Sequence, residues 1–114
     1  APFHCALMRP AADAMAEALA RVEIHRPIVP VVSNVLASAI SDPDEIRKRL
    51  VEQVTGTVRW RESVVYLQRH GVTRLYEIGS GKVLTGLVKR IVEGVEGVAV
   101  NTPDDIEKMV AALV

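Results

Sequence analysis

Residues 74–92 of this 114-residue chain read RLYEIGSGKVLTGLVKRIV, in which a strand pattern, a glycine turn and a helix pattern follow one another. Arg74 to Ile78 is predicted to be a strand, and Gly79-Ser80-Gly81 a tight turn. From Val83 to Val92 the apolar residues recur every three or four positions, which predicts a helix. The apolar run Val98-Ala99-Val100 predicts the next strand. Because a helix between two strands is the usual crossover of a parallel sheet, the sequence predicts an α/β fold.

Further helices are predicted on both sides of this segment. Apolar spacing predicts one helix from Leu7 to Val22 and another from Trp60 to His70. Asp42-Pro43 and Thr102-Pro103 each place a capping side chain before a proline, which predicts helices that start near Pro43 and Pro103. The helices are expected to bury apolar faces, the first and the last among them. The expected buried residues are Met8, Ala12, Met15, Leu19 and Val22 in the first helix and Ile106, Met109, Val110 and Leu113 in the last.

The run Val29–Val32, reaching Asn34, predicts one more short buried strand. The fold class is therefore α/β, with mostly parallel short strands alternating with helices. Three short strands make a poor parallel sheet, since such sheets normally have both faces covered. No repeat, low-complexity tract or linker divides the chain, so residues 1–114 are expected to form one block. Ala1-Pro2-Phe3-His4 lacks an initiator Met and runs into a helix pattern, so we expect a longer chain upstream that supplies the missing strands.

Composition makes several partners unfavourable. Lys plus Arg equals Asp plus Glu at 14 each, so no net charge draws the chain to nucleic acid or to an anionic membrane. No run of about 20 apolar residues could span a bilayer, and no signal peptide pattern is present. With one cysteine and no histidines three or four residues apart, neither a disulfide nor a metal site is expected. A cytoplasmic protein that needs no cofactor fits these features best.

The turn Gly79–Lys82 has some features of a phosphate-binding loop, because N–H groups at a helix N-terminus attract anions. The Walker pattern, however, needs a longer loop and a Ser or Thr where Val83 stands. The dinucleotide pattern needs a third glycine where Leu84 stands. A structural turn between strand and helix is the better interpretation.

Nucleophilic chemistry is incomplete within the chain. His4 adjoins Cys5, but neighbouring residues rarely place a base correctly against a nucleophile, so Cys5 is predicted to be a small packing residue. His25 and His70 lie near helix ends, where a solvated or dipole-interacting histidine is usual. The Gly-x-Ser-x-Gly pattern that exposes a nucleophilic serine is absent.

Four ordered blocks of sequence carry a resemblance to a known family. They are APFHC (1–5) with LM (7–8) and PAA (10–12), PVVSNV (30–35), LVEQ (50–53) with VRW (58–60), and YEIGSGKVLTGL (76–87). In this order the blocks resemble the C-terminal third of bacterial malonyl-CoA:acyl-carrier-protein transacylases, a family related to the acyltransferase domains of fatty-acid and polyketide synthases. Ser80 departs from the family, in which many members have proline, but serine also tolerates a turn.

The resemblance implies the C-terminal segment of an α/β-hydrolase-like acyltransferase core, which starts at the junction with a ferredoxin-like subdomain. It implies transfer of malonyl from malonyl-CoA to the phosphopantetheine thiol of acyl carrier protein, through a malonyl-serine, in fatty acid biosynthesis. His4 matches the family's catalytic histidine, the general base. Gln53 matches the residue whose backbone carbonyl orients the imidazole.

The resemblance also implies that the nucleophilic serine, the oxyanion-hole glutamine and the malonate-binding arginine lie in N-terminal sequence outside this chain. The segment alone is therefore expected to be inactive, and to associate with itself or with the missing N-terminal part. Three alternatives stay open: a polyketide-synthase-type acyltransferase with another acyl group, a non-catalytic α/β interaction module, and a small nucleotide-binding α/β protein.

Overall fold

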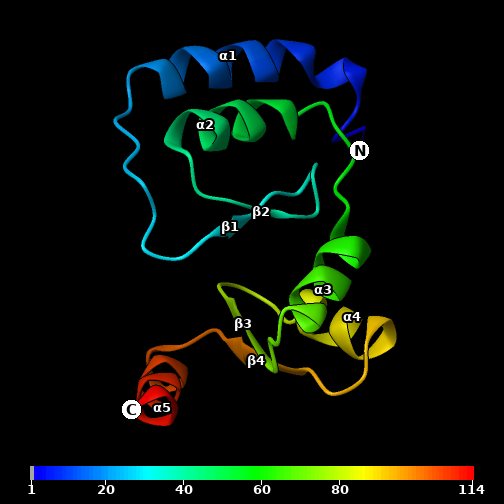
Figure 1. The fold of residues 1–114 in the computed structure, drawn as a ribbon, viewed down its shortest axis with the longest axis vertical. Coiled ribbons are helices and arrows are strands. Elements are labelled where there is room, and N and C mark those ends of the chain that lie inside the picture. Colours follow the sequence, from blue (N-terminus) through cyan, green and yellow to red (C-terminus); the bar gives the residue numbers. More distant parts are fainter. Residues whose placement is uncertain (1) are drawn as a thin grey trace. The chain divides into compact units, whose positions relative to one another are not determined.

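The computed structural model describes residues 2–114, which divide into two compact units at Ser63 and Val64 (Figure 1). The first unit holds a short 3-10 helix, two helices and a hairpin. Their bounds are Ala6–Met8 (η1), Arg9–Ala20 (α1), Val31–Val32 (β1), Ala39–Ile40 (β2) and Pro43–Glu52 (α2). The helix α3, Trp60–Arg69, crosses the boundary in sequence. The second unit continues with Arg74–Ile78 (β3), Val83–Ile91 (α4), Glu96–Val100 (β4) and Pro103–Leu113 (α5).

The helices α1 and α2 run antiparallel beside one another (Figure 1). The predicted start of α2 is confirmed, because the Asp42 carboxylate accepts a hydrogen bond from the Glu45 N–H at 2.9 Å. From the middle of α2, Arg47 donates to the carbonyl of Leu19, in the last turn of α1, and to that of Val22, two residues beyond the helix. These two hydrogen bonds tie the end of α1 to α2. The antiparallel arrangement brings the start of α1 to the end of α2.

The first predicted strand is present but is neither buried nor part of a parallel sheet. β1 pairs antiparallel with β2, with Val31 opposite Ile40, and the Val31 side chain is 42% exposed. The strand β2 was not expected, because Ala39–Ile40 is only two residues long and gives no periodic signal. The turn that joins the strands is tight, since the Ala37 N–H donates to the Ser33 carbonyl at 2.8 Å and Ala37 has φ +53°.

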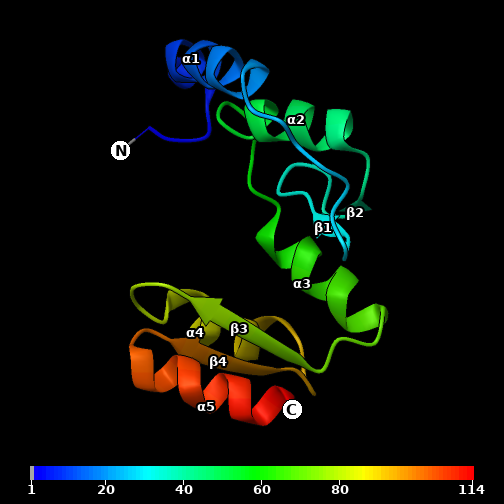
Figure 2. The same cartoon turned by 90° about the vertical axis from the view of Figure 1, so that its left-hand side faces the viewer.

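The second unit confirms the predicted parallel strand–helix–strand segment. β3 and β4 pair in parallel from Arg74 opposite Glu96 to Ile78 opposite Val100. The helices α4 and α5 flank the pair from opposite sides, and α4 contacts both strands (Figure 2). Gly97 permits this packing, since a Cβ there would lie 3.0 Å from Thr85 Cγ2 on α4. The most buried apolar side chains of this unit are those of Val64, Val88, Val95 and Val100.

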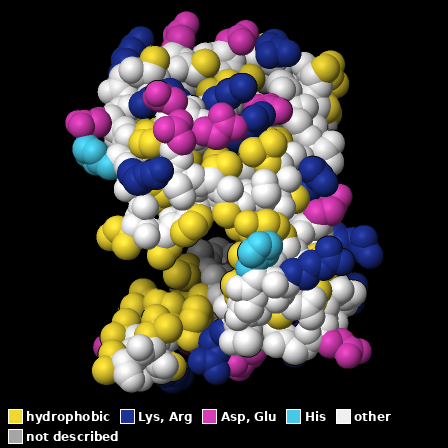
Figure 3. Space-filling view, viewed as in Figure 1, with side chains coloured by type: hydrophobic (Ala, Val, Ile, Leu, Met, Phe, Trp, Pro, Cys, Tyr) yellow, Lys and Arg dark blue, Asp and Glu magenta, His cyan; other side chains and the backbone are white. Residues whose placement is uncertain are grey.

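The apolar faces of α1 and α5 are predicted to be buried, and for much of their length this prediction is wrong. In α1 only Ala12 is buried, whereas Met15 and, beyond the helix, Val22 are exposed. In α5, Ile106 and Val110 are about half exposed, and Figure 3 shows hydrophobic side chains gathered over this helix. Apolar spacing identifies a face that water disfavours, but it does not identify what covers that face. Among the described residues, no helix combines the length and the apolar character needed to cross a membrane.

Candidate active site

The structure brings together the two residues that the family resemblance singled out. His4 Nδ1 lies 2.8 Å from the Gln53 backbone oxygen. A carbonyl oxygen can only accept a hydrogen bond, so the contact requires the proton to be on Nδ1. The other ring nitrogen, Nε2, is then left with its lone pair free, which is the form a general base needs.

The Gln53 carbonyl is available because of its place at the end of α2. Gln53 is the C-cap residue, with φ −62° and ψ −22°. The last carbonyls of a helix have no intrahelical partner, and the helix dipole gives this end a partial negative charge. The Gln53 carbonyl is therefore free to accept the hydrogen bond from His4.

The His4 backbone is held in an unusual conformation. Its φ of +55° lies in the left-handed region, which non-glycine residues seldom adopt and which costs on the order of 1–3 kcal/mol. Next to it, Cys5 is half-buried and free, with its Sγ 3.1 Å from the Pro2 carbonyl oxygen. The His4 side chain is exposed, so its free nitrogen is accessible to a reacting group.

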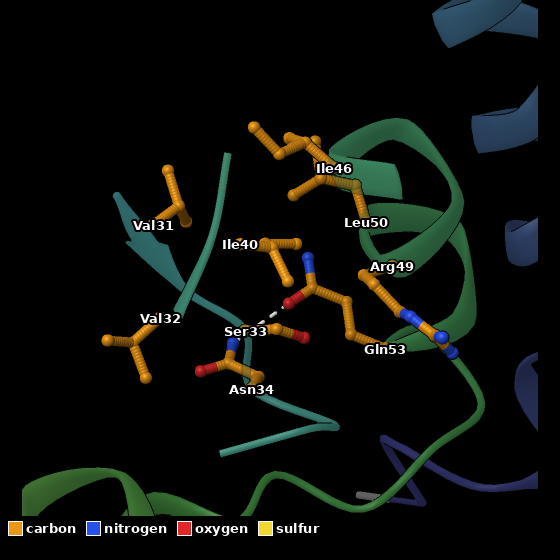
Figure 4. Close-up of a pocket in the computed structure, with 9 residues that line it drawn as sticks. All are labelled: Val31, Val32, Ser33, Asn34, Ile40, Ile46, Arg49, Leu50 and Gln53. Carbon is orange, nitrogen blue, oxygen red and sulfur yellow. Dashed lines mark hydrogen bonds between the residues drawn. The ribbon is translucent and has the colours of Figure 1, made fainter. Parts of the chain in front are cut away.

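Asn34 is the residue of this site to which sequence reasoning assigned no role. Its Nδ2 donates to Gln53 Oε1 at 2.8 Å, as the dashed line in Figure 4 shows. The Asn34 carbonyl in turn accepts from the Arg59 N–H at 2.8 Å. Asn34 and Gln53 line a pocket of about 120 Å³. The rest of its lining comes from the β1–β2 hairpin and α2: Val31, Val32, Ser33, Ile40, Ile46, Arg49 and Leu50. The one sequence signal was indirect, because Asn34 and Gln53 fall in two of the four family-like blocks.

The other two histidines are placed as expected of solvated side chains near helix ends. His70 Nδ1 lies 2.7 Å from the Tyr66 carbonyl oxygen, and its ring stacks on that of Tyr66 with centroids 4.0 Å apart. His25 is exposed and lies 3.7 Å from the Glu23 carboxylate. Within residues 2–114, no group of three or more His, Cys, Asp or Glu side chains is placed to hold a metal ion.

The N-terminus of α4 already binds an anionic side chain. Glu77, on β3, accepts from the Thr85 N–H and the Thr85 hydroxyl, both at 2.7 Å, and from the Leu84 N–H at 3.1 Å. These bonds, first of all that from the Thr85 N–H, hold the pKa of the Glu77 carboxyl below its ordinary 4.5. A phosphate approaching the N-terminus of α4 would meet this carboxylate, which disfavours the nucleotide-binding alternative.

Comparison with known proteins gives a consistent result, although no family model matches the chain. The chain is 49% identical to the malonyl CoA-acyl carrier protein transacylase of Escherichia coli K12 over 98% of its own length and 35% of the relative. Against the protein of the same description in Bacillus subtilis strain 168, the identity is 42% over the same shares.

Solved structures agree with these relatives. The acyl-carrier-protein-S-malonyltransferase of Bartonella henselae matches with a TM-score of 0.91 and 50% identity, over 99% of this chain and 36% of that one. A type II PKS acyl-carrier protein in complex with its malonyl-transacylase matches with a TM-score of 0.87 and 43% identity, over 98% and 36%. The chain thus belongs to the malonyl CoA-acyl carrier protein transacylase family and spans about a third of the length of the relatives it matches.

Proposed function

We propose that this chain is the C-terminal segment of an S-malonyltransferase and supplies its general base, His4. The observation that carries the proposal is the 2.8 Å contact between His4 Nδ1 and the Gln53 carbonyl, which leaves Nε2 free to take a proton. Residues 1–114 would form the closing part of the acyltransferase domain, which begins where a ferredoxin-like subdomain ends.

In the first half of the reaction, His4 Nε2 takes the proton of a serine hydroxyl as the serine oxygen attacks the thioester carbonyl of malonyl-CoA. The carbon–sulfur bond then breaks, and the imidazolium returns the proton to the coenzyme A sulfur. In the second half, Nε2 takes the proton of the phosphopantetheine thiol, whose sulfur attacks the malonyl-serine ester. The carbon–oxygen bond breaks and the serine regains its proton. Throughout, the Gln53 carbonyl keeps Nδ1–H in place and stabilises the imidazolium.

The nucleophilic serine is assigned to sequence outside the chain. Among the described residues, neither a serine nor a cysteine donates a hydrogen bond to the His4 imidazole, which supports this assignment. The substrates of the whole enzyme would be malonyl-CoA and acyl carrier protein, as the names of the relatives state for those proteins. We place the enzyme in the cytoplasm and in fatty acid biosynthesis. A polyketide carrier is the second candidate acceptor, because one of the matched transacylases was solved with such a carrier.

The test is His4→Ala in the full-length enzyme that contains this chain, with His70→Ala as the matched control. His70 makes the same kind of contact, from Nδ1 to a backbone carbonyl, and has no proposed role. His4→Ala should lower kcat for malonyl transfer by roughly a thousandfold or more, whereas His70→Ala should change it less than about threefold. A His4→Ala enzyme that keeps more than about a tenth of the wild-type kcat would show that another group is the base.

A further inference from the structure

Three successive hydrogen bonds of 2.8 Å lead from the start of α3 to His4. The Arg59 N–H donates to the Asn34 carbonyl, Asn34 Nδ2 donates to Gln53 Oε1, and His4 Nδ1 donates to the Gln53 carbonyl. Gln53 is thus held by its side chain and holds His4 by its main chain.

The side-chain contact matters because the main-chain bonds at the end of α2 hold the N–H of Gln53 and its neighbours rather than the Gln53 carbonyl. The Gln53 N–H bonds to the Arg49 carbonyl at 3.0 Å, and the Val54 N–H bonds to the Val51 carbonyl at 3.1 Å. Helix ends fray, and a carbonyl at a frayed end changes direction as ψ changes. A second attachment on the Gln53 side chain restricts that motion.

The surroundings of the Asn34–Gln53 contact strengthen it. Both side chains are half-buried, and Ile40, Ile46 and Leu50 are among the apolar residues that line the same pocket (Figure 4). In such surroundings a hydrogen bond is stronger than in water, and an amide that loses its partner is costly to leave unpaired. The amide pair therefore has a defined geometry.

The hairpin that carries Asn34 also lies close to the turn after α2. A Cβ on Gly56 would lie 3.0 Å from Val35 Cγ1 and 3.0 Å from the Glu52 carbonyl oxygen, so the turn and the hairpin touch without room for a methyl group. The hairpin segment that carries Asn34 is therefore held at two points: the Asn34 carbonyl accepts from the Arg59 N–H, and the Val35 side chain lies against Gly56.

We propose that Asn34 is a positioning residue for catalysis, which acts through the Gln53 side chain to aim the Gln53 carbonyl at His4. This inference rests on the proposed function of His4 as general base. Asn34 touches neither His4 nor a reacting atom in this account, so its effect falls on kcat through the orientation and tautomer of the imidazole.

The test uses the full-length enzyme with Asn34→Leu, Gln53→Leu, the double variant, and Gln53→Glu. Leucine has as many side-chain heavy atoms as asparagine and one fewer than glutamine, and it removes the hydrogen bond, whereas glutamate keeps the oxygen that accepts from Asn34 Nδ2. Gln68→Leu is the matched control, because it removes a similar 2.7 Å side-chain bond, to the Glu93 carbonyl, in the other compact unit. The readouts are kcat, KM for malonyl-CoA, the unfolding midpoint, and the 15N spectrum of labelled histidines.

Each single leucine variant at positions 34 and 53 should lower kcat about tenfold and change KM less than about twofold. The double variant should be no more than about twofold worse than either, because both remove one shared contact. Gln53→Glu should keep several times the kcat of Gln53→Leu, and Gln68→Leu should keep wild-type kcat. The His4 signal, assigned by its loss in His4→Ala, should show Nδ1–H alone in the wild type and a mixture of tautomers in Asn34→Leu.

The proposal is overturned if Asn34→Leu keeps wild-type kcat, if the two leucine effects multiply to about a hundredfold in the double variant, or if the His4 tautomer does not change. If Asn34→Leu does not fold, equal kcat values for Gln53→Leu and Gln53→Glu overturn it in the same way. The two claims fail separately. An active His4→Ala enzyme refutes the proposed function of His4 as the base, whereas the tautomer measurement in Asn34→Leu reports whether Asn34 orients His4.

Discussion

Replacing Val54 by proline should turn the Gln53 carbonyl away from His4. The Val54 N–H donates to the Val51 carbonyl at 3.1 Å, and proline has no such N–H. Proline also disfavours helical geometry in the preceding residue, so Gln53 would leave its ψ of −22° for a ψ of about +120° to +160°. A change of roughly 150° about this bond carries the carbonyl oxygen to the other side of the backbone, which breaks its contact with Nδ1.

The expected loss follows from what the contact does. Without an acceptor at Nδ1, the imidazole can adopt the unproductive tautomer. In serine proteases, replacing the aspartate that orients the histidine by asparagine lowers kcat by about 10⁴ for this reason. The acceptor here is a neutral carbonyl, so we expect a fall in kcat of roughly a hundredfold, with a stability loss of about 1 kcal/mol for the missing hydrogen bond.

The assay is steady-state malonyl transfer by the full-length enzyme, with Val54→Ala as the control that keeps the N–H. Unfolding midpoints of both variants show whether the fold survives. A folded Val54→Pro enzyme that keeps more than about a third of the kcat of Val54→Ala would refute the claim that this carbonyl orients His4.

Three further predictions concern other parts of the chain. Gly56→Ala should lower both the unfolding midpoint and kcat, because the new Cβ would lie 3.0 Å from Val35 Cγ1 and from the Glu52 oxygen. Gly86 lies in α4 with open space around it, so Gly86→Ala should instead raise the free energy of unfolding in urea by about 0.5–1 kcal/mol. The pKa of Glu77 is held below 4.5 in the folded state, so its contribution to stability is complete above pH 4.5 and disappears as the pH falls through the lowered pKa. In urea unfolding, Glu77→Gln should therefore lose less free energy of unfolding between pH 7 and pH 3 than the wild type loses. Residues 1–114 alone should retain no radiolabelled malonate and should form dimers or larger species in light scattering, because the apolar face of α5 is exposed; a monomer with cooperative unfolding, or a covalent label, would contradict this.

Local chemistry made much of the fold predictable. Asp42 and Thr102 were identified as caps from the prolines that follow them, and both accept the expected hydrogen bonds at the starts of α2 and α5. The strand β3 was predicted with its observed bounds, because its pattern is closed by Gly79, whose φ of +137° suits a glycine turn. These signals lie within a few residues of the structure that they specify.

Contacts between distant residues were not predictable from pattern alone. Glu77 was assigned only to a strand, although its carboxylate caps a helix that starts six residues later. The Asn34–Gln53 contact joins residues 19 positions apart, and neither side chain carries a signal for the other. His4 and Gln53 lie 49 residues apart, and only the family resemblance predicts their contact. Their hydrogen bond is confirmed, whereas their catalytic roles stay predictions.

In the proposed mechanism His4 serves as the base in both halves of malonyl transfer. Single-turnover kinetics of the full-length His4→Ala enzyme test this role, because they separate malonyl-serine formation from transfer to acyl carrier protein. Both steps should slow by roughly a thousandfold, while the Kd for malonyl-CoA should change less than about threefold. Formation of malonyl-serine within about tenfold of the wild-type rate in that enzyme would show that His4 is not the base.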